Sequence, residues 1–171
     1  MLAAVYWNAR TTPLEEAASL LVAACRSLAQ AGYTSLRYKG RSRKEVRAFS
    51  PDSESAASLL IRGVNHRDID KTAMPELGFS FGLWSGGTEE SAYEFTGQIG
   101  NTTNIGSNSL MLRLPARGPL SYEGNETRVL ALFRELVSMS NADQGVICEP
   151  QDISWVGGRL SPAIPSKAKH Q

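Results

Sequence analysis

The chain has 171 residues, of which 42% are hydrophobic and 20% are charged, and its 18 Lys and Arg against 17 Asp and Glu give a formal net charge of +1. A domain of this size buries about 70% of the surface of its unfolded chain, which is enough for a substantial core. The balanced charge excludes a generic binder of nucleic acid or anionic membranes, and it excludes an acidic disordered chain.

The charges are unevenly distributed along the chain. Residues 1–50 carry 8 basic and 3 acidic residues (+5), residues 51–100 carry 3 and 8 (−5), and residues 101–171 carry 7 and 6 (+1). Folding could present the first two blocks as a basic and an acidic face, which would orient a charged partner. Alternatively, the two blocks interleave on the surface and serve only solubility.

Neither the cysteines nor the N-terminus indicates secretion. Cys25 and Cys148 form no disulfide framework and no Cys/His metal motif in a chain of this length. The apolar run over residues 1–7 lacks a basic start and is too short for a signal sequence or a membrane span. We therefore expect a cytoplasmic protein with no membrane contact.

The first predicted elements are a strand and a helix. Residues 2–8 are rich in strand-forming side chains. The helix that follows has Thr12 as its N-cap, Pro13 at its first position, Glu15 completing a capping box and Gly32 as its stop.

A shorter strand and helix come next. Residues 35–39 alternate and predict a strand, after which a basic run reads as a connector. A second helix is expected to start after Ser50 or Asp52 and to stop at Gly63. Residues 64–76 then form a loop.

The strongest strand pattern covers residues 77–84. One face is apolar, and the other carries small residues until Trp84. A turn leads to residues 93–96, which alternate and predict an antiparallel hairpin with this strand. The glycine-containing residues 97–107 are expected to form a mobile connection.

The remaining pattern predicts three further elements and a tail. They are a strand at 108–114, a helix at about 123–139, a strand at 145–148 and a flexible C-terminal tail at 161–171. The element order indicates an α+β fold: a single domain over residues 1–160, with about three helices packed on a mostly antiparallel sheet.

Few residues suggest catalysis. His66, Asp68 and Asp70 alternate and could hold a divalent ion in a small metal-dependent enzyme, although a solvated loop is the commoner outcome for such a segment. The 97–107 loop lacks the Lys-Ser or Lys-Thr of a phosphate-binding loop, and no serine or cysteine nucleophile has a suitable base. We predict no catalytic, cofactor-binding or metal-binding residue.

Two features suggest binding. A basic run over residues 39–47 could contact nucleic acid, but neither a basic domain nor a recognisable reader motif accompanies it. Trp84 precedes Gly86 and Gly87 at the end of a strand, where an exposed ring would anchor a protein partner and a buried ring would only fill the core.

Several segments, in order along the chain, resemble the immunity protein 52 family of bacterial polymorphic-toxin systems. The most similar stretch is 75–86, and the others are 38–45, 63–68, 108–112, 123–139 and 143–146. The resemblance covers roughly residues 3–160. The chain departs from the family pattern at His66, where we expect Arg, and at Gln144, where we expect an aromatic residue.

This resemblance implies an α+β immunity protein without catalytic activity. Its partner would be a cognate nuclease toxin with a restriction-endonuclease-like fold, often delivered by a type VI secretion system. The immunity protein would bind that toxin in the producing cell and prevent self-killing. Inhibition could occlude the active site, block toxin oligomerisation or act from a remote site.

A nuclease has a basic DNA groove, so acidic groups on its inhibitor would favour rapid and specific binding. The acidic block supplies five candidates, with Trp84 as the apolar anchor: Asp68, Asp70, Glu76, Glu89 and Glu90. The metal-dependent enzyme and the nucleic-acid binder stay open as alternatives. A toxin gene beside the gene for this chain would favour immunity.

Overall fold

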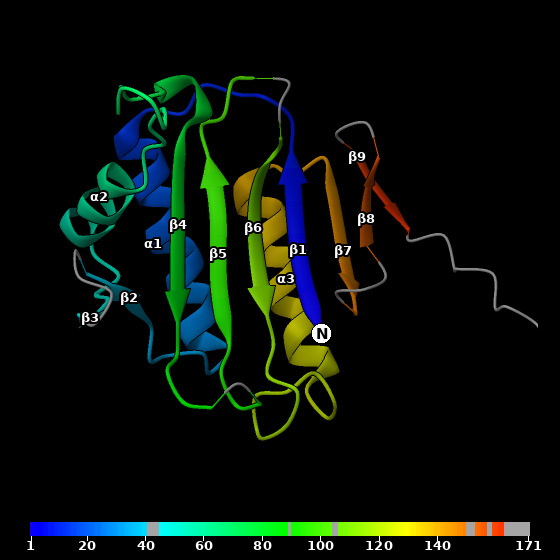
Figure 1. The fold of residues 1–171 in the computed structure, drawn as a ribbon. Helices are drawn as coiled ribbons and strands as arrows, with labels where there is room; N and C mark the ends of the chain where they lie inside the picture. The colour runs from blue at the N-terminus through cyan, green and yellow to red at the C-terminus, as the bar shows by residue number, and fades with distance from the viewer. Residues whose placement is uncertain (41–44, 89, 104–105, 150–152, 157–158, 163–171) are drawn as a thin grey trace, which may run out of the picture.

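Antiparallel strand pairing organises the chain in the computed structural model, which describes residues 1–40, 45–88, 90–103, 106–149, 153–156 and 159–162. Seven strands form one sheet in the order β3-β2-β4-β5-β6-β1-β7 (Figure 1). Their bounds are β1 (Leu2–Trp7), β2 (Arg37–Lys39), β3 (Val46–Ala48), β4 (Phe79–Trp84), β5 (Glu94–Ile99), β6 (Asn108–Arg113) and β7 (Gln144–Cys148). The predicted α+β fold is confirmed.

Three helices accompany the sheet: α1 (Leu14–Gln30), α2 (Ser53–Arg62) and α3 (Glu126–Ser140). Figure 1 shows α1 and α3 behind the sheet, with α2 beside the β4 edge. A single 3-10 turn, η1 (Pro75–Leu77), precedes β4. Strands β8 (Ile153–Val156) and β9 (Arg159–Pro162) pair separately as a hairpin.

The core lies between the sheet and the helices, because alternate residues of each strand point toward α1 and α3. Its members include Val5, Trp7, Phe81, Leu83, Phe95, Ile99, Leu110 and Leu112 from the strands, and Leu21, Leu28, Val129 and Leu136 from the helices. The sequence alternation and the helical spacing predict most of these positions, whereas Ile99 falls in the predicted 97–107 loop.

The opposite face of the sheet has no described helix in front of it (Figure 1). Its β4 and β5 positions pair across the two strands as Ser80 with Gln98, Gly82 with Thr96 and Trp84 with Glu94. Gly82 and Glu94 are exposed, and the other four residues are half-buried. This part of the sheet is therefore open to solvent.

The start of α1 differs from the prediction. The helix begins at Leu14, Pro13 occupies the cap position, and no side chain caps the helix. The Thr12 hydroxyl donates instead to the Arg10 carbonyl at 3.5 Å, and Thr12 is buried. The predicted capping box is wrong because tertiary packing, which the local pattern does not encode, fixes Thr12. Gly32 has φ +93°, as expected for a left-handed stop.

The start of β4 and the end of α2 are set by close backbone approach. At Gly78, φ is +69° and an added Cβ would lie 2.3 Å from the Ile99 carbonyl oxygen, so the strand begins at Phe79 rather than at residue 77. At Gly63, an added Cβ would lie 1.6 Å from the Ser80 carbonyl oxygen. The Ser80 amide donates to the Gly63 carbonyl at 2.9 Å, so α2 ends directly against β4.

Four other boundaries were wrong. Strand β5 continues to Ile99 and shortens the predicted 97–107 loop, and α3 begins at Glu126 rather than near residue 123. Strand β3 pairs with β2 within the predicted basic connector. Strand β9 includes the first two residues of the predicted tail, and residues 163–171 lie outside the described part of the chain.

Candidate functional site: a cationic and aromatic pocket beside strand β4

A pocket lies where β2 leaves the edge of the sheet. Strand β2 pairs with β4 through Arg37 opposite Trp84. Beyond this pair, the C-terminal end of α2 reaches the space beside β4 and closes one side of a cavity of about 600 Å³. The cavity is lined by Tyr38, Lys39, Leu59, Arg62, Gly63, residues 80–84, Glu94 and Thr96.

Two cations in the pocket lie over aromatic rings. The Lys39 Nζ is 6.0 Å from the centroid of the Trp84 ring, and the Arg62 guanidinium carbon is 5.0 Å from that of Tyr38. Arg62 Nη2 also donates to the Lys39 carbonyl at 2.8 Å. These contacts join β2, the end of α2 and β4, and they hold both cations at the pocket wall.

Gly82 has no side chain, so the backbone of β4 is uncovered on this side of the pocket. A Cβ added there would have the Thr96 Cγ2 as its nearest neighbour, at 3.9 Å, so the position is open above the strand. On one side of Gly82 the ring of Trp84 is half-buried, and on the other side Ser80 accepts a 3.5 Å hydrogen bond from Asn65. The arrangement leaves one face of the sheet accessible beside a fixed aromatic ring.

The acidic group at the pocket is already paired. Glu94 lies 3.9 Å from Arg113 on β6, and both side chains are exposed. Among the residues that the structure describes, no carboxylate lies within ion-pair distance of Lys39 or Arg62. The pocket therefore has an excess of positive charge.

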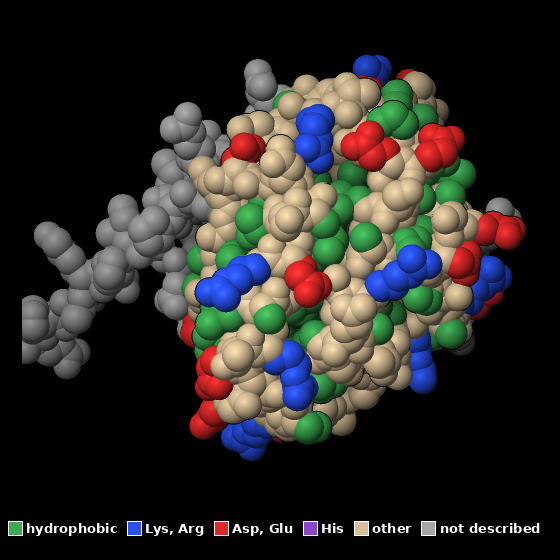
Figure 2. All heavy atoms as spheres, turned by 180° about the vertical axis from the view of Figure 1, so that it is seen from behind, with side chains coloured by type: hydrophobic (Ala, Val, Ile, Leu, Met, Phe, Trp, Pro, Cys, Tyr) green, Lys and Arg blue, Asp and Glu red, His purple; other side chains and the backbone are tan. Residues whose placement is uncertain are grey.

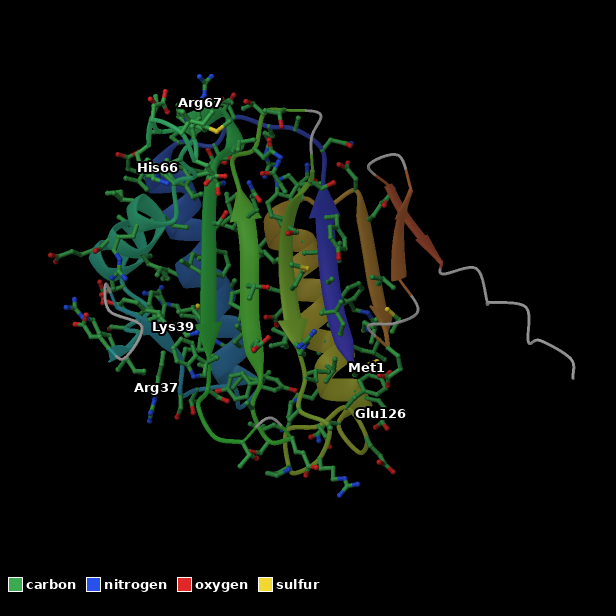
Figure 3. All side chains as sticks on the ribbon, in the orientation of Figure 1. Met1, Arg37, Lys39, His66, Arg67 and Glu126 are labelled. Atoms are coloured by element: carbon green, nitrogen blue, oxygen red, sulfur yellow. The ribbon has the colours of Figure 1, made fainter. Side chains whose placement is uncertain are left out.

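The acidic residues predicted to bind a partner do not surround this pocket. Asp68 and Asp70 lie in the loop between α2 and β4, and Glu76 lies in η1. Figure 3 places this loop, marked by His66 and Arg67, at the upper end of β4, with Arg37 and Lys39 near the lower end. The Asp70 carboxylate accepts a 3.0 Å hydrogen bond from the Thr72 amide, which lowers the pKa of that carboxyl.

Glu90 lies in the turn between β4 and β5, at the opposite end of β4 from the loop. Its backbone carbonyl accepts hydrogen bonds from the Ala116 and Arg117 amides. Glu89 lies outside the described residues. Because a six-residue strand spans about 17 Å, the structure separates Glu90 from Asp68, Asp70 and Glu76. Of the described residues predicted to contact a toxin, Trp84 alone lines the pocket.

The segment proposed for a metal-dependent enzyme forms a turn. His66 pairs with Ala73 in an isolated bridge, and the Arg67 amide donates to the Thr72 carbonyl at 2.9 Å. Within the described ranges, no three His, Cys, Asp or Glu side chains gather as metal ligands would. Cys25 is buried, and this burial raises the pKa of its thiol to about 12, which makes it a poor nucleophile.

The basic run is divided between two environments. Lys39 lines the pocket, whereas Arg47 on β3 donates from Nε to Glu45 at 2.7 Å. Residues 41–44 lie outside the described part of the chain. On the helix side of the molecule, basic and acidic side chains are interspersed (Figure 2). That side is therefore not a face of one charge.

Comparison of the chain with protein-family models, with curated proteins and with solved structures finds no match. The resemblance to the immunity protein 52 family stays a prediction. Of the helices in the described ranges, none has the length and apolar character that crossing a bilayer requires.

Sequence reasoning missed Tyr38, Lys39 and Arg62 as a site. Lys39 and Arg62 are 23 positions apart, and no local spacing links them. The predicted family resemblance includes the segments 38–45, 63–68 and 75–86, and residues from all three line this pocket.

Proposed function

We propose that this chain is an immunity protein that binds a cognate nuclease toxin in the cytoplasm and neutralises it by direct contact. The toxin would have a restriction-endonuclease-like fold and would be a type VI secretion effector. The observation that carries the proposal is the convergence of three separate family-like segments on one pocket. Residues 38–39, 63 and 80–84 are distant in sequence, so their common position follows from the fold.

The chemistry of the pocket supports protein binding. Trp, Tyr and Arg are the residues most enriched among those that dominate interface energetics, and Trp84, Tyr38 and Arg62 lie together here. Their mutual contacts fix the side chains before a partner arrives, which reduces the ordering cost of association. The exposed β4 and β5 positions beside the pocket supply additional contact area.

The test is co-expression with the toxin domain encoded by the neighbouring gene. We expect this chain to restore growth of toxin-expressing cells and to co-purify with the toxin. Trp84→Ala should weaken binding by about 2 kcal/mol, or roughly thirtyfold, as expected for a central aromatic contact.

Leu130→Ala is the matched control, because Leu130 is a 39% exposed apolar residue on α3, across the sheet from the pocket. Its substitution should leave binding unchanged. Failure of the wild-type chain to bind the toxin or protect the cells would contradict the proposed function. Equal losses for both variants would contradict the assignment of the site.

A further inference from the structure

We propose that the pocket beside β4 binds a carboxylate side chain of a protein partner. The identity of that partner rests on the proposed function, whereas the chemistry of the site rests on the residues of the pocket. The recognised group would be an Asp or Glu side chain that projects from the partner between Lys39 and Arg62. The sequence predicted that acidic residues of this chain bind basic groups of the partner. Here basic residues of this chain bind an acidic group of the partner.

The pocket has an excess of positive charge. Lys39 and Arg62 line it, and Arg37 pairs with Trp84 at its lower end. Glu94, the acidic residue of the lining, lies beside Arg113. Because no described carboxylate lies within ion-pair distance of Lys39 or Arg62, these two cations provide an attractive potential for an oxyanion.

Contacts with other elements hold the donors of the pocket in position. A guanidinium has five N–H donors, and Arg62 uses one of them on the Lys39 carbonyl. The Arg62 guanidinium lies over the Tyr38 ring, and the Lys39 ammonium lies over the Trp84 ring. An arginine edge matches a carboxylate in a two-point hydrogen bond, and an ammonium group adds a further charged donor.

The pocket is open on one side, which favours a side chain of a protein over a free small ligand. Sites for small molecules enclose most of the ligand surface. Here one side of the pocket continues into the open sheet face, where Gly82 and Glu94 are exposed. A carboxylate carried by a protein brings an adjoining surface that this face can contact.

Acidic side chains at both ends of β4 disfavour a polyanion as the ligand of the pocket. Asp68, Asp70 and Glu76 lie near one end of β4 and Glu90 lies near the other. These groups would repel an extended phosphate backbone that passed through the pocket. They would attract basic residues around an isolated carboxylate on the partner. A nuclease groove, in which carboxylates that hold metal lie among basic groups, has this arrangement.

The test uses a short peptide with a single Glu among neutral residues as the probe and the same peptide with Gln in that position as its control. Binding is followed by NMR through the indole N–H of Trp84, which is assigned by its loss in Trp84→Phe. We expect the Glu peptide, but not the Gln peptide, to shift this signal and those of Lys39 and Arg62. Lys39→Met and Arg62→Gln should each reduce the affinity at least about tenfold.

Arg134→Gln provides the matched control, because Arg134 is an exposed arginine on α3, across the sheet. It removes one positive charge outside the pocket and should change the affinity less than about threefold, as general charge screening predicts. A loss equal to that of the pocket variants would overturn the proposal.

Three further outcomes would also overturn it. One is an unshifted Trp84 signal at about 10 mM probe, a concentration at which even weak binding is detectable. Another is a stronger response to inorganic phosphate, which would assign the site to a free anion. The third is tighter binding of single-stranded DNA, which would favour nucleic acid. None of these readouts uses the toxin, so the absence of toxin binding would contradict the proposed function without removing a positive peptide result.

Discussion

Charged side chains beside β4 are held to different degrees in the pocket and in the loop at the start of the strand. In the pocket, aromatic rings and a backbone carbonyl from other elements hold Lys39 and Arg62. At the upper end of the strand, the 65–74 loop is held mainly by its own turn, in which the Lys71 amide donates to the Arg67 carbonyl at 3.0 Å. Ile69 at its tip is fully exposed.

The number of charged residues in a region does not by itself determine how well that region can bind a partner. A partner that engages the loop must order side chains that have few tertiary contacts, and this ordering opposes association. The pocket already holds its cations in place. The proposed binding site therefore rests on the position of fixed donors rather than on the count of acidic residues along the chain.

The largest expected effect comes from breaking the pocket wall at Gly63. In Gly63→Ala, the new Cβ would lie 1.6 Å from the Ser80 carbonyl oxygen, so α2 and β4 must separate. We expect the free energy of unfolding to fall by about 3 kcal/mol, the upper part of the usual range for overpacking. Urea denaturation followed by circular dichroism measures this change.

Gly82→Ala is the matched substitution on the adjacent strand. Its Cβ would lie 3.9 Å from the nearest described atom, so we expect the stability to change by less than about 1 kcal/mol. Similar destabilisation by the two substitutions would show that close approach of α2 to β4 does not determine the role of Gly63.

The residues around this contact show which parts of the fold a sequence predicts and which it does not. Alternation placed Phe81 and Leu83 in the core, because strand geometry alone sends alternate residues to opposite faces. Gly63 was correctly placed after α2 but was interpreted as a helix stop. Its φ is −89°, which any residue can adopt, so contact with β4 rather than local geometry requires glycine.

The candidate site was less predictable for a related reason. Asp68 and Glu90 belong to one acidic block in the sequence, yet β4 places them at opposite ends. Lys39 and Arg62 come together because β2 diverges from β4 after Arg37 and passes beside the end of α2. Charge composition is visible in a sequence, whereas such a meeting depends on long-range packing.

A charge reversal in the loop tests whether the loop or the pocket directs association. In Asp68→Lys combined with Asp70→Lys, two exposed acids become basic. Acidic-face recognition predicts an association rate with the toxin about tenfold lower at low salt. If the loop contributes little, the rate should change less than about twofold, because exposed charges beyond a Debye length are screened.

Stopped-flow measurements at two salt concentrations distinguish these outcomes. Because the Ile69 side chain is fully exposed and Asp68 and Asp70 are exposed beside it, the double variant should remain folded, with stability within about 0.5 kcal/mol of the wild type. A salt-dependent tenfold decrease in the association rate would make the loop a principal contact. It would also contradict the view that the pocket is better prepared to bind than the loop.

The smallest expected effect concerns two hydrogen bonds from a backbone amide to an Asp carboxylate, one at the start of α2 and one in the 65–74 loop. Asp52 Oδ1 accepts a 2.8 Å hydrogen bond from the Ser55 amide at the start of α2, and this bond lowers the pKa of the Asp52 carboxyl. Asp70 makes the corresponding bond to the Thr72 amide in the loop. Only the first of these bonds supports a helix that forms the pocket wall.

Because the folded pKa of Asp52 is below its unfolded value of about 3.9, its contribution to stability is present above that pH and is lost as the pH falls through the folded pKa. Asp52→Ala should therefore slightly lower the urea concentration at the midpoint of unfolding at pH 7. In this variant the midpoint should also decrease less as the pH is lowered. Asp70→Ala should leave the global midpoint unchanged, because the loop can open without unfolding the core. Equal shifts for both variants would indicate that the loop is as strongly coupled to the fold as α2 is.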